Sequence, residues 1–86
     1  MNEQQLAAIM DTYAEKLLRI AYFYTKNVQS AEDIVQEVFI AFYYTNKYTE
    51  QGELGAFLTR MTSNKCKDYL KSWAYRTHLL REKLEI

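Results

Sequence analysis

Hydrophobic residues recur along the first part of the chain at the spacing of an amphipathic helix. Positions three and four apart form one apolar stripe: Leu6, Ile9, Tyr13, Leu17, Ile20 and Tyr24. Because such positions share one face of a helix, the pattern predicts a helix over residues 3–24 with this stripe against the core. The segment TKNVQ then interrupts the pattern, and its Asn27 is suited to a turn or a helix end.

A second helix is predicted over residues 30–47. Its core-facing arc consists of Ile34, Val35, Val38, Ala41 and Phe42, with Phe39 at the edge. Ser30 has a side chain suited to an N-cap, and Asp33 three positions later resembles a capping box. We therefore expect this helix to begin at Ser30 and to end near Lys47.

The polar arc of this second helix also contains two large apolar side chains. Asp33, Gln36 and Glu37 line the arc, and helical spacing places Ile40 and Tyr44 on the same stripe. Polar residues around an aliphatic and an aromatic centre are typical of protein-docking surfaces. The alternative is that another helix covers Ile40 and Tyr44, and the pattern alone leaves both interpretations open.

A third helix is predicted from about Leu54, after an irregular segment over residues 48–55 that contains both glycines. Its core arc consists of Leu58, Met61, Thr62, Cys66, Tyr69, Leu70 and Trp73, with Phe57 near the border. We expect this helix to reach at least residue 73. Beyond that point it either continues to residue 84 or gives way to a short fourth helix.

The opposite side of the third helix is basic. Its residues are spaced i, i+4, i+7 and i+11 and line one face: Arg60, Asn64, Lys67 and Lys71. Cations can hold phosphates, an amide can read a base edge, and nearby aromatic rings could stack on unpaired bases. The alternative is an ordinary solvated face, which is the more common meaning of such a pattern.

Composition predicts an all-α fold of three or four helices on one core. The chain has 86 residues, no proline and two glycines, which are too few turn formers for a many-stranded sheet. Its net charge is zero, but residues 1–53 have four Lys/Arg against eight Asp/Glu, and residues 54–86 have seven against three. This asymmetry indicates two partners, the basic half facing a polyanion, or else an internal dipole.

The residue types present also predict whether the protein is an enzyme and in which cellular compartment it lies. Cys66 and His78 are the only cysteine and histidine, and no nucleophile–base set or phosphate-binding glycine loop is recognisable. We therefore expect no metal, no cofactor and no enzymatic activity. A single cysteine, the lack of a membrane-length apolar run and the lack of a secretory signal pattern predict a cytoplasmic protein.

Two motifs resemble region 2 of bacterial RNA polymerase sigma factors, most closely the extracytoplasmic-function (ECF) group. AEDIVQEVFIAFY is followed, at the spacing of that family, by AFLTRMTSNKCKDYL. The stretch YAEKLLRIAYFYTKNVQSAED is similar to the opening helix and loop of the group. The resemblance covers roughly residues 10–73, and it implies a single region 2 domain over residues 1–86.

The resemblance implies that the helix over residues 30–47 docks on the clamp coiled coil of the polymerase β′ subunit. The family's D-x-x-Q-E pattern assigns Asp33, Gln36 and Glu37 to the docking face. Helix geometry adds Ile40 and Tyr44 as its apolar centre. An anti-sigma factor is a further expected partner.

In this family the third helix and the preceding loop recognise and open the minus-ten promoter element, whose non-template strand is bound single-stranded. The matched positions on the DNA-facing helix are Arg60, Asn64, Lys67 and Lys71. Phe57 stands where the family often has tryptophan, and Tyr48 lies in the loop that captures a base.

Several departures from the family pattern predict weak DNA binding by the isolated domain. After DYL the family usually has a dense run of arginines, whereas this chain has KSWAYRTHLLREK. The loop is acidic at Glu50 and Glu53, where basic residues are common in the family. Lys65 replaces an apolar residue at the edge of the core, where its aliphatic stem can be buried. The second hypothesis is therefore a regulatory, co-sigma-like protein acting mainly through protein contacts. Because no region 4 helix-turn-helix is present, we expect a fragment of a longer factor, or else a short subunit completed by a partner.

Overall fold

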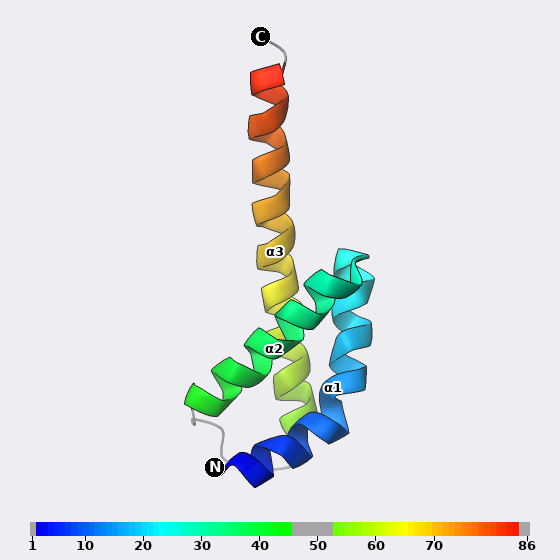
Figure 1. Ribbon diagram of the computed structural model, residues 1–86, viewed down its shortest axis with the longest axis vertical. Helices are drawn as coiled ribbons and strands as arrows, with labels where there is room; N and C mark the ends of the chain where they lie inside the picture. The colour runs from blue at the N-terminus through cyan, green and yellow to red at the C-terminus, as the bar shows by residue number, and fades with distance from the viewer. Residues whose placement is uncertain (1, 46–52, 85–86) are drawn as a thin grey trace.

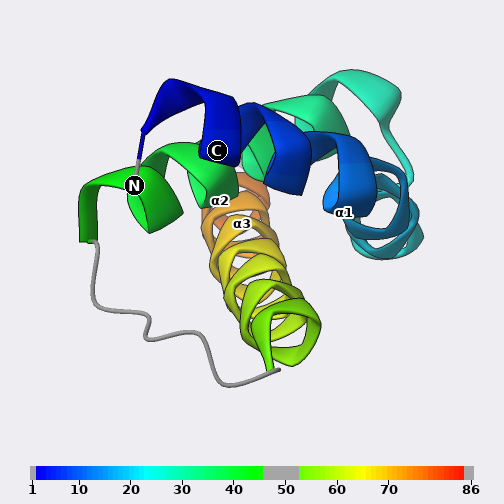
Figure 2. The ribbon, with the colours of Figure 1, turned by 90° about the horizontal axis from the view of Figure 1, so that it is seen from below.

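The computed structural model describes residues 2–45 and 53–84, which form three α-helices that all contact one another. α1 spans Glu3–Thr25, α2 spans Val28–Thr45 and α3 spans Leu54–Leu84. α1 and α2 lie on one side of α3 (Figure 2), and α3 continues well beyond both of them (Figure 1). The predicted all-helical class is confirmed. In the described residues α3 is continuous past Trp73, so the alternative of a short fourth helix is wrong.

The core lies where the three helices meet, and α2 contributes most of it. Its inward side chains are at most 5% exposed: Ala31, Ile34, Val35, Val38, Phe39 and Phe42. Leu17 and Ala21 from α1, together with Leu58 and Cys66 from α3, complete the buried cluster. The apolar side of α2 is thus covered from both neighbouring helices, as the predicted arcs require.

The start of α2 differs from the sequence prediction. The helix begins at Val28, and Asn27 caps it, because Asn27 Oδ1 accepts a hydrogen bond from the Ser30 backbone N–H at 2.9 Å. Ser30 lies inside the first turn, with its hydroxyl oxygen 3.0 Å from that of Tyr69 on α3. The prediction of an N-cap at Ser30 and a capping box with Asp33 was wrong, because an asparagine three positions earlier takes the same role.

The connection between α1 and α2 is short because α1 ends sharply. Lys26 adopts a left-handed backbone conformation with φ 55°, and its N–H donates to the carbonyl oxygen of Tyr22 at 2.8 Å. Such a cap turns the chain out of the helix within one residue. Only Lys26 and Asn27 separate the two helices, and this keeps α2 directly beside α1.

The predicted core arc of α3 is correct only in its first half. Its buried and partly buried members are Leu58, Met61, Thr62, Cys66 and Tyr69. Leu70 and Trp73 are 39% and 54% exposed, so placing them in the core was wrong. The reason is length, since α1 and α2 do not extend alongside the second half of α3 (Figure 1).

We predict that Phe42→Ala lowers the free energy of unfolding by about 3–5 kcal/mol, because losing a buried ring leaves a cavity. Phe42 is 2% exposed, whereas Tyr44 on the same helix is 77% exposed. Tyr44→Ala should therefore change the free energy of unfolding by less than about 0.5 kcal/mol. Urea unfolding followed by circular dichroism measures both variants. Equal losses would contradict the burial of one side of α2.

Candidate binding surfaces

The outer side of α2 carries a continuous exposed stripe, which we call the α2 stripe: Asp33, Gln36, Glu37, Ile40 and Tyr44. All five residues are exposed, with Ile40 at 56% and Tyr44 at 77%. Neither α1 nor α3 covers the two apolar members, so the alternative that another helix buries them is wrong. Apolar side chains bordered by carboxylates and an amide have the composition of a protein-docking surface.

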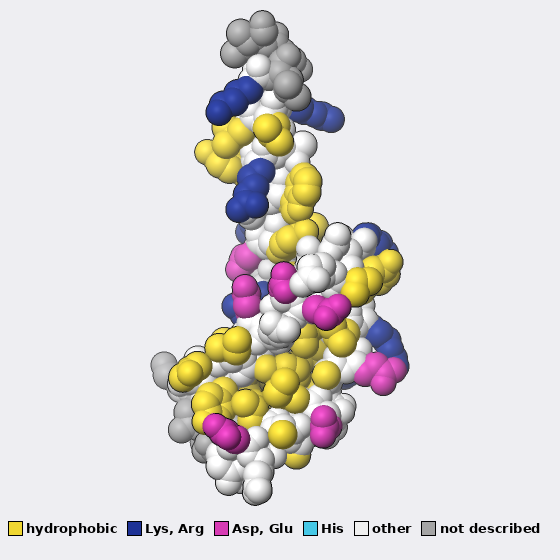
Figure 3. Space-filling view, in the orientation of Figure 1, with side chains coloured by type: hydrophobic (Ala, Val, Ile, Leu, Met, Phe, Trp, Pro, Cys, Tyr) yellow, Lys and Arg dark blue, Asp and Glu magenta, His cyan; other side chains and the backbone are white. Residues whose placement is uncertain are grey.

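The apolar end of the α2 stripe borders a cleft of about 430 Å³ between α1 and α2. The residues that line it are Leu6, Met10, Gln36, Phe39, Ile40, Tyr43 and Tyr44. In Figure 3 hydrophobic side chains gather over this lower part of the molecule. The sequence did not assign Leu6 and Met10 to this surface, because periodicity within α2 does not reveal which α1 residues lie beside it. Met10, at 37% exposed and just off the predicted α1 stripe, was the available signal.

The polar end of the α2 stripe borders a second cleft, of about 640 Å³, between α2 and α3. Here Glu37 Oε2 lies 3.9 Å from Lys65 Nζ. The Lys65 side chain is 34% exposed, in agreement with a buried stem and an outward ammonium group. Because the Glu37 side chain is 66% exposed, the pair is weak and leaves the carboxylate able to bind another molecule.

Four residues line the side of α3 that faces away from the core, and we call them the α3 row: Arg60, Asn64, Lys67 and Lys71. All four are exposed. Within residues 2–45 and 53–84, no carboxylate forms an ion pair with any of the three cations. Among the described residues this positive charge is therefore not paired, and such unpaired cations can hold phosphates.

The predicted aromatic members do not all join the α3 row. The Phe57 ring packs against the core, with its centroid 6.1 Å from that of Phe42. Tyr48 lies outside the described residues. Tyr75 is 65% exposed and stands one helical turn beyond Lys71 on the same side, so it is an exposed ring that continues the α3 row.

Cys66 and His78 do not indicate a catalytic or metal site in addition to these surfaces. Cys66 is fully buried, and burial raises the pKa of its thiol above the ordinary value, which makes it a poor nucleophile. His78 Nε2 lies 3.0 Å from Glu82 Oε1 on the surface of α3. The described residues contain no cluster of metal-ligating side chains. None of their helices is long and apolar enough to cross a membrane.

Comparison with known protein families matches residues 9–77 to Sigma-70 region 2. The matched segment is 69 of the 86 residues, and it contains both the α2 stripe and the α3 row. Comparisons with curated proteins and with solved structures gave no significant match. The family match, the three-helix architecture and the two sequence motifs agree with one another. The chain belongs to the sigma-70 region 2 family, whose members are non-enzymatic factors in transcription initiation.

Proposed function

We propose that this domain is of the ECF type and binds two partners through two faces. The α2 stripe docks on the β′ clamp helices of RNA polymerase, and the α3 row holds the opened non-template strand of the minus-ten promoter element. The observation that carries the proposal is the placement of two exposed surfaces on different helices: an acidic stripe with an apolar centre on α2, and a row of cations on α3 that form no ion pair within the described residues. The ECF assignment rests on the residues of the two motifs, AEDIVQEVFIAFY and AFLTRMTSNKCKDYL.

The chemistry of the α2 stripe supports docking on another protein. Ile40 and Tyr44 provide apolar surface from which a bound partner would exclude water. The adjoining cleft extends this apolar surface onto α1. Asp33 and Glu37 form an acidic rim that favours a partner surface with basic residues. Gln36 lies between the rim and the apolar centre and lines the cleft, where its amide can pair with a partner's backbone.

The chemistry of the α3 row supports binding of a single strand. From Arg60 to Lys71 the helix rises by about 17 Å, a length over which one strand can be held at several phosphates. Asn64 stands between the cations, where its amide can reach a base edge. Strand opening then needs no bond chemistry, because a surface that binds the single strand more tightly than the duplex shifts the equilibrium toward the open form.

Two observations favour the second function, a regulatory role exercised mainly through protein contacts. The Phe57 ring packs beside Phe42 rather than in the α3 row, which leaves fewer rings for stacking on bases. The net charge of zero points the same way, since it gives no long-range attraction to DNA. We therefore expect the isolated domain to bind promoter DNA weakly and to need the polymerase for tight binding.

We predict that the double change Gln36→Ala, Glu37→Ala weakens binding to the isolated β′ clamp helices by about tenfold or more, because it removes a carboxylate of the acidic rim together with the amide that lines the cleft. Pull-down and titration calorimetry measure the loss. The matched control is Gln4→Ala, Glu15→Ala, which removes the same side chains from exposed positions on α1. Full binding by the α2 variant, or an equal loss in the control, would count against the docking face.

We predict that Lys67→Ala weakens binding of a labelled minus-ten single strand in the presence of core polymerase. Its salt dependence should fall by about 0.7 in log–log slope, as expected for one lost phosphate contact. Asn64→Ala should instead reduce the preference for the minus-ten sequence over a scrambled strand. Fluorescence anisotropy measures both effects, with Lys16→Ala on α1 as the exposed-lysine control. Indifference to both α3 changes would favour the regulatory role.

A further inference from the structure

The second half of α3 projects from the body as a single helix, which we call the arm, residues 70–83. The molecule measures 54 × 22 × 20 Å, and the long dimension follows α3 (Figure 1). Every arm residue except Thr77 is exposed. The arm therefore receives little tertiary support, although an unsupported helix of this length is only marginally stable in water.

The arm nevertheless carries a regularly spaced seam of three large apolar residues and one threonine: Leu70, Trp73, Thr77 and Leu80. The steps between these residues are three, four and three, which is the heptad spacing that brings two helices together. Leu70, Trp73 and Leu80 are 39%, 54% and 59% exposed. Cys66 precedes them in the same register and is fully buried, so the seam continues the core-facing side of α3 past the point where α1 ends.

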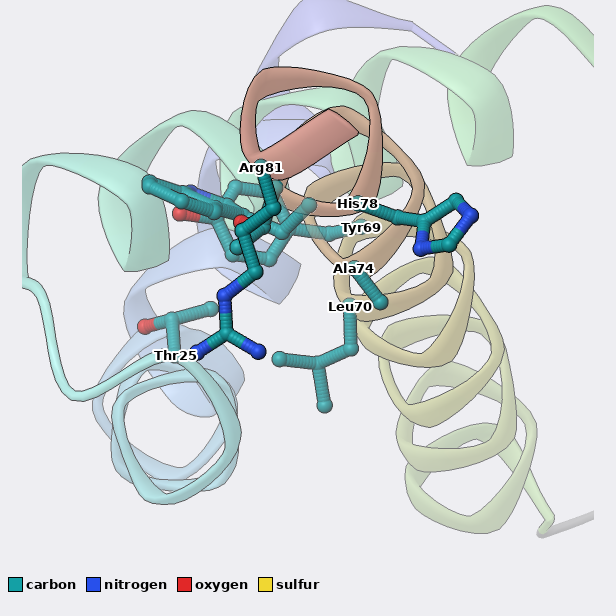
Figure 4. Close-up of a pocket in the computed structure, with 8 residues that line it drawn as sticks. Thr25, Tyr69, Leu70, Ala74, His78 and Arg81 are labelled. Atoms are coloured by element: carbon teal, nitrogen blue, oxygen red, sulfur yellow. The ribbon is translucent and has the colours of Figure 1, made fainter. Parts of the chain in front are cut away.

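A cleft marks the place where a further helix could join the body. It has a volume of about 570 Å³ and lies between Thr25, at the end of α1, and the arm. Leu70 and Arg81 extend on the side of α3 where Thr25 lies, and His78 extends away from it (Figure 4). A helix laid along the seam would thus pack against the end of α1 as well as against the arm.

The charges beside the seam indicate which kind of partner helix would bind there. In the heptad register, the flanking positions are Ala74, Arg76, Arg81 and Lys83, so every charged flank is basic. None of the three cations forms an ion pair with another described residue. Lys and Arg stand beside hydrophobic side chains along the arm in Figure 3. A second copy of the chain would set these cations against like charges, whereas a helix with acidic flanks would neutralise them.

We propose that the arm binds an amphipathic helix of a partner protein, with acidic residues on both sides of its apolar seam. This site is distinct from both proposed binding faces. On α3 the seam lies about 120° around the helix axis from the α3 row, as the residue spacing requires. The α2 stripe is on another helix. The inference therefore goes beyond polymerase docking and promoter binding, and it stands or falls independently of them.

The experiment uses Trp73, the only tryptophan of the chain, as its reporter. The full chain is titrated with a tryptophan-free synthetic peptide of about three heptads, with leucine at the seam positions and glutamate at the flanks. The control peptide has lysine at the flanks. We expect the glutamate peptide to shift Trp73 emission to the blue and to saturate, with an affinity at least about tenfold higher than that of the lysine peptide.

Three variants test the assignment to individual residues. Leu80→Ser, far from the body, should weaken binding of the glutamate peptide by about tenfold or more. Arg81→Glu with Lys83→Glu should reverse the preference in favour of the lysine peptide. Tyr75→Ala changes an exposed ring on another side of the arm and should leave the affinity unchanged.

Several outcomes would overturn the proposal. Equal binding of the two peptides would mean that the seam binds apolar helices without regard to their charge. If neither peptide binds, the seam is not a docking site for a helix. A shift with duplex DNA but not with the glutamate peptide would make the arm a DNA contact. Sedimentation that shows a dimer of the chain, converted to monomer by Leu80→Ser, would show that the occupant is a second copy.

Discussion

α2 is buried on one side and exposed on the other, and both the core and the outer surfaces of the molecule follow from this division. Six of its side chains fill the core between α1 and α3, which fixes the rotation of the helix about its own axis. Once that rotation is fixed, the opposite side can only face outward. Ile40 and Tyr44 are therefore exposed because Val38 and Phe42, on the opposite side of the same helix, are buried.

The same packing separates the two proposed partners. α3 uses Leu58, Thr62 and Cys66 to close the core, so the cations of the α3 row must lie on its far side. In the described residues no ion pair joins the acidic surface on α2 to the cations of the α3 row, so each surface stays available to its own partner. The Glu37–Lys65 pair is the exception at the border of the two helices, and its exposure keeps it weak.

The sequence predicted the helices and their inner faces well, because burial of one side of a helix leaves a periodic record. It predicted the start of α2 less well, since Asn27 and Ser30 are both good N-caps and only the backbone decides between them. It also placed Leu70 and Trp73 in the core, because a periodic apolar stripe is the same whether the covering helix belongs to the chain or to a partner. Of the candidate sites, the exposed stripe and row follow from spacing, but their assignment to polymerase and promoter rests on the family.

Site-specific photo-cross-linking, in the complex of this chain with core polymerase and promoter DNA, tests whether α2 and α3 contact different partners. A photoreactive amino acid is placed at Ile40 on α2 or at Asn64 on α3, both of which are exposed. We expect position 40 to cross-link to the β′ subunit and not to DNA, and position 64 to cross-link to the non-template strand and not to β′. Cross-links from both positions to the same partner would contradict this expectation.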